Sequence, residues 1–172
     1  MAQDPSPPPA TEVYRAWVAV HQAALLLQAA VAAQLRAQRL DWPRAALLAV
    51  LRAHGPQRIT TLAHYLLSQT TTMTDLIDRL ERAGLAQRSR DATDRRVVLV
   101  ALTAAGEAAA VGVDAALAEV ATAVFGTAQA DIPQLTALLR RVRDVSALTA
   151  GIPSEHFAVA AETLTLPQDP AA

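Results

Sequence analysis

The sequence contains no cysteine and no lysine, and aromatic side chains make up only 3% of its 172 residues. The lack of cysteine excludes disulfides, thiolate metal sites and cysteine redox sensing. With so few aromatic rings, a core has to be built mainly from alanine, leucine and valine, and 52% of the residues are hydrophobic. Alanine and leucine are strong helix formers. The composition therefore predicts a largely helical chain that forms one domain, or a small domain with added helices.

An excess of charge is also lacking, because 15 basic residues, all of them arginine, oppose 16 acidic residues and leave a net charge of −1. No overall positive field draws the chain onto nucleic acid, so such binding would have to rest on a local patch. Residues 58–103 form such a patch, with seven arginines against five acidic residues.

The N-terminal segment has no charged region followed by an apolar one, and glutamine, arginine and histidine interrupt the longest apolar runs. A secretion signal and a transmembrane span are therefore not expected. We expect a soluble, cytoplasmic protein.

Apolar residues at steps of three and four predict a long helix with Thr11 as its N-cap, and two later helices capped by Thr103 and Asp131. The two later helices are apolar on more than one face, and such helices have to be buried, here against a second subunit. The expected regions are a disordered lead-in at 1–10, a helical dimerisation region at 11–40 and 103–148, a central lobe at 41–102, and a tail at 149–172 with a short helix near 154–163.

The central lobe predicts a helix–turn–helix followed by a charged β-hairpin. Asp41 before Trp-Pro is typical of a helix N-cap, and Gly55 and Gly84 are typical of helix ends. A run rich in valine and leucine at 97–102 indicates the second strand of the hairpin. The expected elements are a helix over about 42–53, a two-turn helix from Thr60 to about Leu67, a helix from Ser68 or Gln69 to Gly84, and strands over 85–90 and 96–102.

The helix that begins near Gln69 carries short hydrogen-bonding side chains on its first turns. An α-helix fits the major groove of B-DNA, where its N-terminal residues reach base edges and threonine methyls can contact thymine methyls. The alternative role of these residues is to cap the free helix amides, but a cap requires only one or two of them. The side chains predicted to contact bases are Gln69, Thr70, Thr71, Thr72 and Thr74.

The hairpin supplies arginines for the DNA backbone and the minor groove. Arg95, at or near the tip, is placed to enter a minor groove, where narrow A·T-rich stretches concentrate negative potential. Arg88 and Arg90 are placed for phosphates, and a solvated surface position is the alternative for each. Asp94 is expected either to hold Arg96 or to serve only as a turn residue. The predicted DNA-contacting arginines are Arg79, Arg88, Arg90, Arg95 and Arg96.

The motifs Leu62-Ala63, Leu80-Glu-Arg-Ala-Gly-Leu85, Arg88, Asp94-Arg-Arg96 and Leu102-Thr-Ala-Ala-Gly106 occur in this order. They resemble the multiple antibiotic resistance regulator (MarR) family, and the order of elements matches over about 11–148. The resemblance implies a mainly helical fold with a small β wing, a winged helix–turn–helix between N- and C-terminal dimerisation helices. It further implies a homodimer that binds a pseudo-palindromic operator in double-stranded DNA and regulates transcription, usually as a repressor.

Two residues depart from the family pattern. Asp75 stands where the family often carries a basic or neutral residue, and an acid facing phosphates weakens binding unless it pairs with Arg79 or accepts from a cytosine amino group. Leu67 stands in the helix–turn–helix turn, where a small residue is common, so the angle between the two helices is open to change. Both departures affect the operator more than the fold.

The resemblance also implies a small effector, often a phenolic or other aromatic anion, bound between the dimerisation helices and the DNA-binding lobe. Trp17 and His21 lie one helical turn apart and could line such a site with Arg52 or His54. The alternative is that Trp17 packs in the core and that His21 is a surface or hydrogen-bonded residue.

No chemistry beyond binding is indicated. The four histidines show no short ligand spacing, so no metal site and no cofactor are expected. The sequence has no glycine-rich phosphate loop and no histidine–acid pair at useful spacing, which argues against an enzyme. The alternative to a DNA-binding regulator is a helical dimerisation module that acts through protein contacts, and Asp75 and the near-neutral charge favour it.

Overall fold

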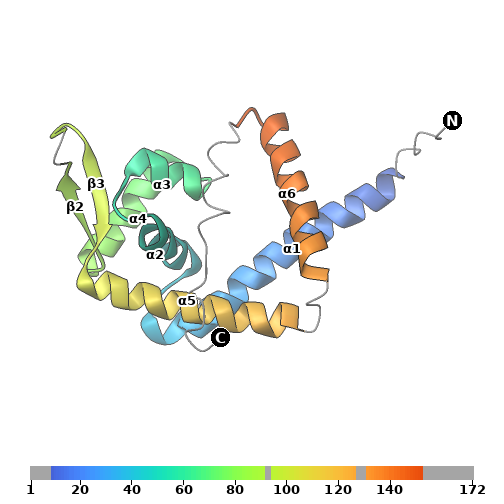
Figure 1. Cartoon of the computed structure of the whole chain (residues 1–172), viewed down its shortest axis with the longest axis horizontal. Coiled ribbons are helices and arrows are strands. Elements are labelled where there is room, and N and C mark those ends of the chain that lie inside the picture. The colour runs from blue at the N-terminus through green and yellow to red at the C-terminus, as the bar shows by residue number, and fades with distance from the viewer. Residues whose placement is uncertain (1–8, 92–93, 127–130, 153–172) are drawn as a thin grey trace.

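The computed structural model describes residues 9–91, 94–126 and 131–152. It confirms a mainly helical fold with a small antiparallel sheet of strand order β1-β3-β2. A compact lobe lies at one end, and α1 and α6 reach away from it (Figure 1). The elements are α1 Ala10–Gln34, the 3-10 helix η1 Leu35–Gln38, α2 Trp42–His54, β1 Gln57–Arg58, α3 Ile59–Tyr65, α4 Thr70–Arg82, β2 Ala86–Arg90, β3 Val98–Leu102, α5 Ala104–Phe125 and α6 Ile132–Thr149.

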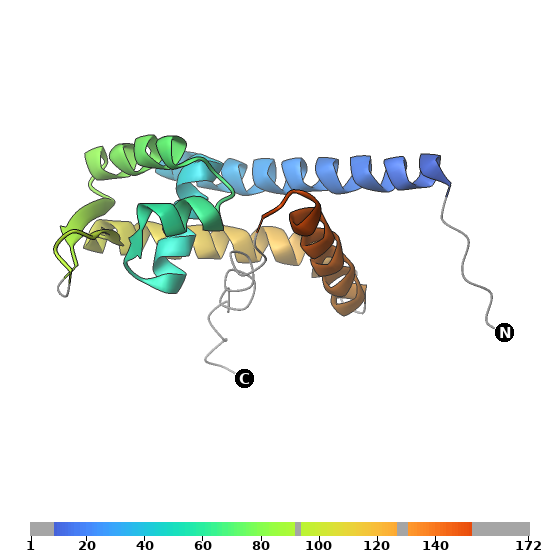
Figure 2. The same ribbon diagram turned by 90° about the horizontal axis from the view of Figure 1, so that it is seen from above.

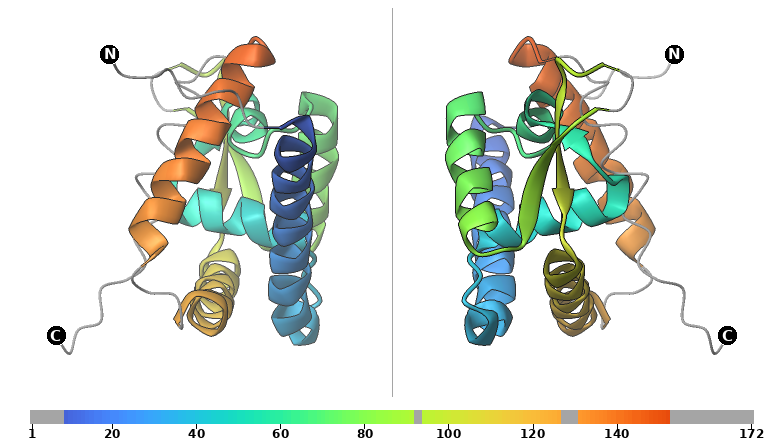
Figure 3. Two further views of the ribbon diagram at one scale, coloured as in Figure 1. Left: turned by 90° about the vertical axis from the view of Figure 1, so that its right-hand side faces the viewer. Right: turned by 90° about the vertical axis from the view of Figure 1, so that its left-hand side faces the viewer.

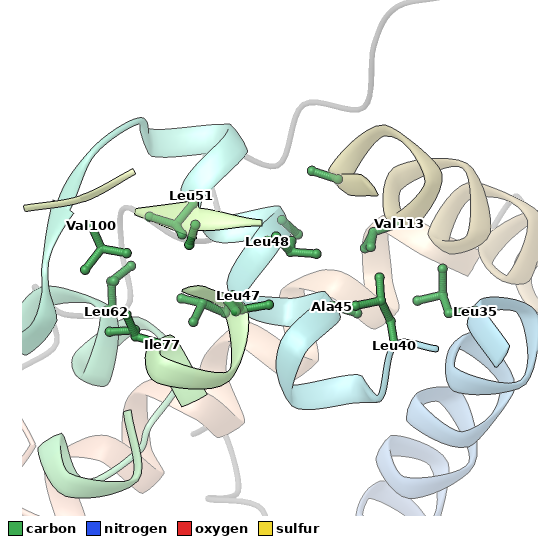
Figure 4. Packing of buried hydrophobic residues seen from close by; sticks show 14 of the residues in the cluster. Leu35, Leu40, Ala45, Leu47, Leu48, Leu51, Leu62, Ile77, Val100 and Val113 are labelled. Carbon is green, nitrogen blue, oxygen red and sulfur yellow. The ribbon is translucent and has the colours of Figure 1, made fainter. Parts of the chain in front are cut away.

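Helix α2 occupies the centre of the hydrophobic core. Its side chains Leu47 and Leu51 lie with Leu62, Ile77 and Val100 of the lobe, whereas other side chains of α2 lie beside α5 and the end of α1 (Figure 4). The residues that α2 buries are Ala45, Leu47, Leu48, Ala49 and Leu51. Because one helix contributes to both halves, the lobe and α5 share a single core.

The start of α2 is fixed as the sequence predicts. The Asp41 carboxylate accepts a hydrogen bond from the Arg44 amide at 3.1 Å, so Asp41 is the N-cap. Burial raises the pKa of Asp41, but the hydrogen bonds and the charge of Arg44 outweigh that effect and hold the pKa below its usual value.

Thr103 joins α5 to the lobe. Its hydroxyl accepts from the Gly106 amide at 3.0 Å, which caps α5 as predicted, and donates to the Gly84 carbonyl at 2.6 Å. The Thr103 amide also donates to the Leu85 carbonyl at 3.1 Å. A Cβ added at Gly106 would lie 1.9 Å from the Leu85 carbonyl oxygen, so only glycine fits there. The Leu-Thr-x-x-Gly motif is therefore the connection between the end of the central lobe and α5.

Two helix starts differ from the sequence prediction. Thr60 does not cap α3; the helix begins at Ile59, after Arg58 in extended conformation. The reason is a tertiary contact that local patterns do not reveal, because Gln57 and Arg58 pair with Val100 and Leu99 to form a third strand. Helix α1 begins at Ala10 with Pro9 as N-cap, so Thr11 is not the cap and the expected lead-in ends earlier. Residues 1–8 and the helix expected near 154–163 lie outside the described residues.

The turn between α3 and α4 places Leu67 in the left-handed conformation, with φ of 50°. Its side chain is 68% exposed, so packing does not offset the steric cost of this conformation. Leu67, one of the two departures from the family pattern, therefore makes this turn locally strained.

By length and composition alone, α1 and α5 are each apolar enough to cross a membrane, which the polar interruptions in the sequence did not predict. In α5, part of this apolar surface belongs to the core, where Ala110 and Val113 are fully buried. In α1 the only buried residue is Val31, near its C-terminal end, and the helix extends past the end of α5 (Figure 2). The first half of α1 therefore presents apolar side chains to the outside of this chain.

We predict that Gly106→Ala lowers the free energy of unfolding by about 2–3 kcal/mol, because the new methyl group overlaps a backbone oxygen that cannot rotate away. Chemical denaturation at one protein concentration measures this. Gly126→Ala is the matched control, since its Cβ would meet only the Thr122 side chain at 3.9 Å. Equal stability of the two variants would contradict the proposed close packing.

Candidate nucleic-acid interface

Helix α4 is held in the lobe by one apolar face. Met73, Ile77 and Leu80 are buried, and they recur at the spacing of one side of a helix. Leu62 and Ala63 of α3, the first helix of the helix–turn–helix, are also buried. The opposite face of α4 lies at the outer edge of the molecule (Figure 3). The lobe thus presents a whole helical face that is free to enter a groove.

The first turn of α4 is exposed and carries no side-chain cap. Gln69 is the N-cap residue but makes no capping hydrogen bond with its side chain, and Thr70, Thr71 and Thr72 are exposed. The first amides of a helix have no acceptor within it, so the free amides of α4 lie at the same end of the helix as these exposed hydroxyls. Thr74 differs, because its hydroxyl donates to the Thr70 carbonyl at 2.9 Å. Capping therefore does not account for the threonine run.

The hairpin turn is organised by backbone and carboxylate contacts. The Asp94 carboxylate accepts from the Arg96 amide at 2.9 Å, and Asp91 accepts from the Asp94 amide at 3.0 Å. Asp94 therefore holds the backbone of Arg96 and not its guanidinium group. Arg90 donates to the Arg95 carbonyl at 2.7 Å, and the side chains of Arg95 and Arg96 are exposed. These contacts fix the backbone from which Arg95 projects.

Arg88 forms ion pairs within the lobe, which the sequence did not predict, and its contact with a phosphate stays a prediction. Its guanidinium group forms an ion pair with Asp78 at 2.7 Å and a second one with Glu81, both on α4. Its amide also donates to Glu81 at 2.8 Å. Arg88 therefore links β2 to α4 and neutralises two acids of that helix. Asp78 and Glu81 lie one turn apart just before the Gly84 turn, and this spacing was the signal that sequence reasoning missed.

Three charged residues of α4, Asp75, Arg79 and Arg82, are exposed on its outer face. Asp75 and Arg79 are both exposed and four residues apart, yet no ion pair joins them among the described residues. The pairing considered from the sequence is therefore not formed in this conformation.

The four residues considered for an effector pocket are not brought together in this chain. Trp17 is 62% exposed and stacks on His21, with ring centroids 5.7 Å apart, on the outlying part of α1. Arg52 instead pairs with Asp114 of α5, and His54 stacks on Tyr65 at 4.7 Å. Burial lowers the pKa of His54, which favours the neutral ring. Trp17 is therefore not packed in the core of this chain, and these four residues do not line a common pocket.

Metal binding is not indicated at this surface. Among the residues that the structure describes, no group of three histidine, aspartate or glutamate side chains lies close enough to hold a metal ion.

We predict that Arg88→Ala lowers the free energy of unfolding by roughly 1–2 kcal/mol, because Asp78 and Glu81 are left without their cation in a half-exposed setting. Thermal or chemical unfolding measures the change. Arg79→Ala removes the same charge from an exposed site without an ion pair and should leave stability within about 0.5 kcal/mol. A loss as large in Arg79→Ala would contradict the specific role of Arg88.

Comparisons with known proteins agree with this architecture. Residues 40–98 match the model of the MarR family. A Bacillus subtilis protein described as an uncharacterized HTH-type transcriptional regulator, YfiV, is 34% identical over 64 residues, which cover 37% of this chain and 40% of that protein. The match thus spans less than half of that relative.

Solved structures match over a larger part of the chain. A probable transcriptional regulator from Pseudomonas aeruginosa is 29% identical, with a TM-score of 0.63, and the match covers 72% of this chain and 92% of that one. A mutant MarR from E. coli, complexed with operator DNA, is 21% identical, with a TM-score of 0.69, and the match covers 76% and 95%. MarR-family regulators are DNA-binding transcription factors and not enzymes. Over residues 40–98 this chain is thus similar in sequence to the MarR family, and its fold is similar to those of a probable transcriptional regulator and of MarR itself.

Proposed function

We propose that this protein is a homodimeric, sequence-specific DNA-binding regulator of transcription, acting as a repressor that a small molecule releases. The observation that carries the proposal is the uncapped, threonine-rich start of α4, exposed beside a hairpin that projects Arg95. Helix N-terminal residues reach base edges in the major groove, while arginines of a wing reach the adjacent minor groove.

The predicted contacts divide into three kinds of interaction with DNA. Gln69, Thr71 and Thr72 carry exposed hydrogen-bonding groups suited to base edges. Arg79 and Arg96 are exposed cations suited to phosphates. Arg88 and Arg90 act indirectly, since one binds acids of α4 and the other binds the hairpin backbone. The E. coli MarR, which shares the fold, was solved in complex with operator DNA, and this supports DNA binding by the present chain.

The homodimer is supported by apolar side chains that this chain leaves uncovered. On α6, Leu138, Val142 and Val145 recur at helical spacing and are exposed, Val145 by 63%. On α1, Tyr14, Trp17 and other apolar residues are exposed in the same way. Extended exposed apolar surface of this kind marks an interaction site, and a second copy of the same helices has the matching character.

Release by an effector is supported by a cavity of about 330 Å³ between α1, α2 and α5. Leu27, Val31, Trp42, Leu117 and Phe125 line it, and no lining residue is charged. This lining fits an uncharged aromatic molecule better than the anion considered from the sequence. A ligand there would contact the dimerisation helices and the first helix of the lobe at once, so its binding would change their relative position.

The second candidate function is a dimerisation module that acts through protein contacts without binding DNA. Exposed Asp75 in the middle of α4 favours it, because a carboxylate repels phosphates. The DNA-binding experiment below separates the two functions.

We predict that the protein enriches one pseudo-palindromic sequence from a random pool of duplex DNA at low salt. Its affinity should fall linearly with salt on logarithmic axes, by a slope of about 0.9 for each phosphate neutralised. Arg95→Ala should weaken binding roughly tenfold without lowering thermal stability, because its side chain is exposed. Arg36→Ala, which removes an exposed charge outside the lobe, is the control. Absence of any enriched sequence at low salt would favour the protein-contact module.

We predict that Leu138→Glu with Val145→Glu converts the protein to a monomer and abolishes tight operator binding, because two charges would be buried at the proposed interface. Size-exclusion chromatography with light scattering measures the mass. Ser146→Glu adds the same charge at an exposed polar site of α6 and should leave the dimer intact. A wild-type monomer would contradict the proposed assembly.

A further inference from the structure

We propose that Asp75 determines operator specificity by accepting a hydrogen bond from the N4 amino group of a cytosine in the major groove. The inference rests on the proposed function and deepens it. Asp75, whose charge opposes binding to DNA in general, would thereby select among DNA sequences.

The position of Asp75 on α4 makes a base contact geometrically direct. At about 100° per residue, Asp75 lies on the side of the helix opposite the buried Met73, Ile77 and Leu80. Thr71 and Arg79 lie one turn before and after it on the same exposed face. Any docking that presents this face to a groove therefore brings the Asp75 carboxylate to its floor.

The electrostatic state of Asp75 differs from that of the other two acids of the helix. Asp78 and Glu81 are paired with Arg88, which cancels much of their repulsion toward phosphates. Within the described residues, Asp75 has neither an ion pair nor a side-chain hydrogen bond. Its full negative charge is thus carried to the DNA, where a carboxylate without a donor would be strongly unfavourable.

The chemistry of base edges identifies the donor. Guanine and thymine present carbonyl acceptors to the major groove, so a carboxylate is repelled by both. Adenine presents its N6 amino donor beside the N7 acceptor, whose lone pair opposes the second carboxylate oxygen. Cytosine's own major-groove edge presents only the N4 amino donor, with a C–H group where adenine has its N7 acceptor. Cytosine is therefore the base that satisfies an unpaired carboxylate at this position.

Removal of the Asp75 charge should therefore raise the affinity for DNA in general and lower the specificity for the operator. Asp75→Ala should bind non-cognate DNA more tightly than the wild type, because a repulsive charge is gone. The same variant should lose the cytosine preference at one position of each half-site. Asp75→Asn can both donate and accept, and an amide pairs well with adenine N6 and N7, so its preference should move from cytosine toward adenine.

The experiment is selection from a random duplex pool with the wild type, Asp75→Ala and Asp75→Asn, followed by affinities for operators changed at the enriched position. We expect the wild type to prefer cytosine there by roughly tenfold, Asp75→Ala to lose the preference, and Asp75→Asn to shift it. Glu119→Gln, which removes an exposed charge on α5, is the control and should select the wild-type sequence.

Three results would overturn the assignment. An unchanged preference in both Asp75 variants would overturn it alone, with the proposed function intact. A second result is that Asp75→Ala and Arg79→Ala both lose a preference for guanine, and that Asp75→Ala has no further effect in the Arg79→Ala background. Arg79 would then be the base-reading residue and Asp75 its positioning partner. Failure of the wild type to enrich any sequence would overturn the proposed function and this inference together.

Discussion

The close packing of α5 on the backbone of the Gly84 turn is the constraint on which the rest of the structure depends. At Gly106 the helix passes so near the Leu85 carbonyl that no side chain fits, and Thr103 donates two hydrogen bonds to the same turn. This turn is also the end of α4. The recognition helix, the first strand of the wing and the long helix therefore share one rigid junction, and a displacement of α5 moves the DNA-facing surface with it.

Of the three acids on α4, two form ion pairs with Arg88 and one, Asp75, forms none among the described residues. Arg88 neutralises Asp78 and Glu81 and joins the wing to α4, while Arg90 holds the hairpin backbone. Only part of the arginine excess counted in the sequence is thus available to DNA, and Asp75 opposes it on the same face. The local net charge therefore overstates the attraction to phosphates, because some arginines bind acidic side chains or backbone carbonyls of the lobe itself. The outer face of α4 is left with side chains of both charges beside hydroxyl groups, which suits the selection of bases.

Sequence patterns predicted those structural features that depend on residues close together in the chain. Asp41 and Thr103 cap their helices, and the face of Met73, Ile77 and Leu80 is buried, because capping and periodicity are local properties. Strand β1 was missed because its two residues are extended only through pairing with β3. The ion pairs of Arg88 were not predicted because its partners lie across a turn. Trp17 was placed near Arg52 because the direction of α1 relative to the lobe is set by tertiary packing. The contacts of the individual side chains with DNA remain predictions.

The two tryptophans of the chain stand in different environments, and this separates two events that are otherwise hard to resolve. Trp17 is mostly exposed on the outlying part of α1, whereas Trp42 lines the cavity between α1, α2 and α5. In the proposed dimer, assembly changes the surroundings of the first indole and an occupant of the cavity changes those of the second. Intrinsic fluorescence of single-tryptophan variants would therefore record association and ligand entry as independent signals, without any added label.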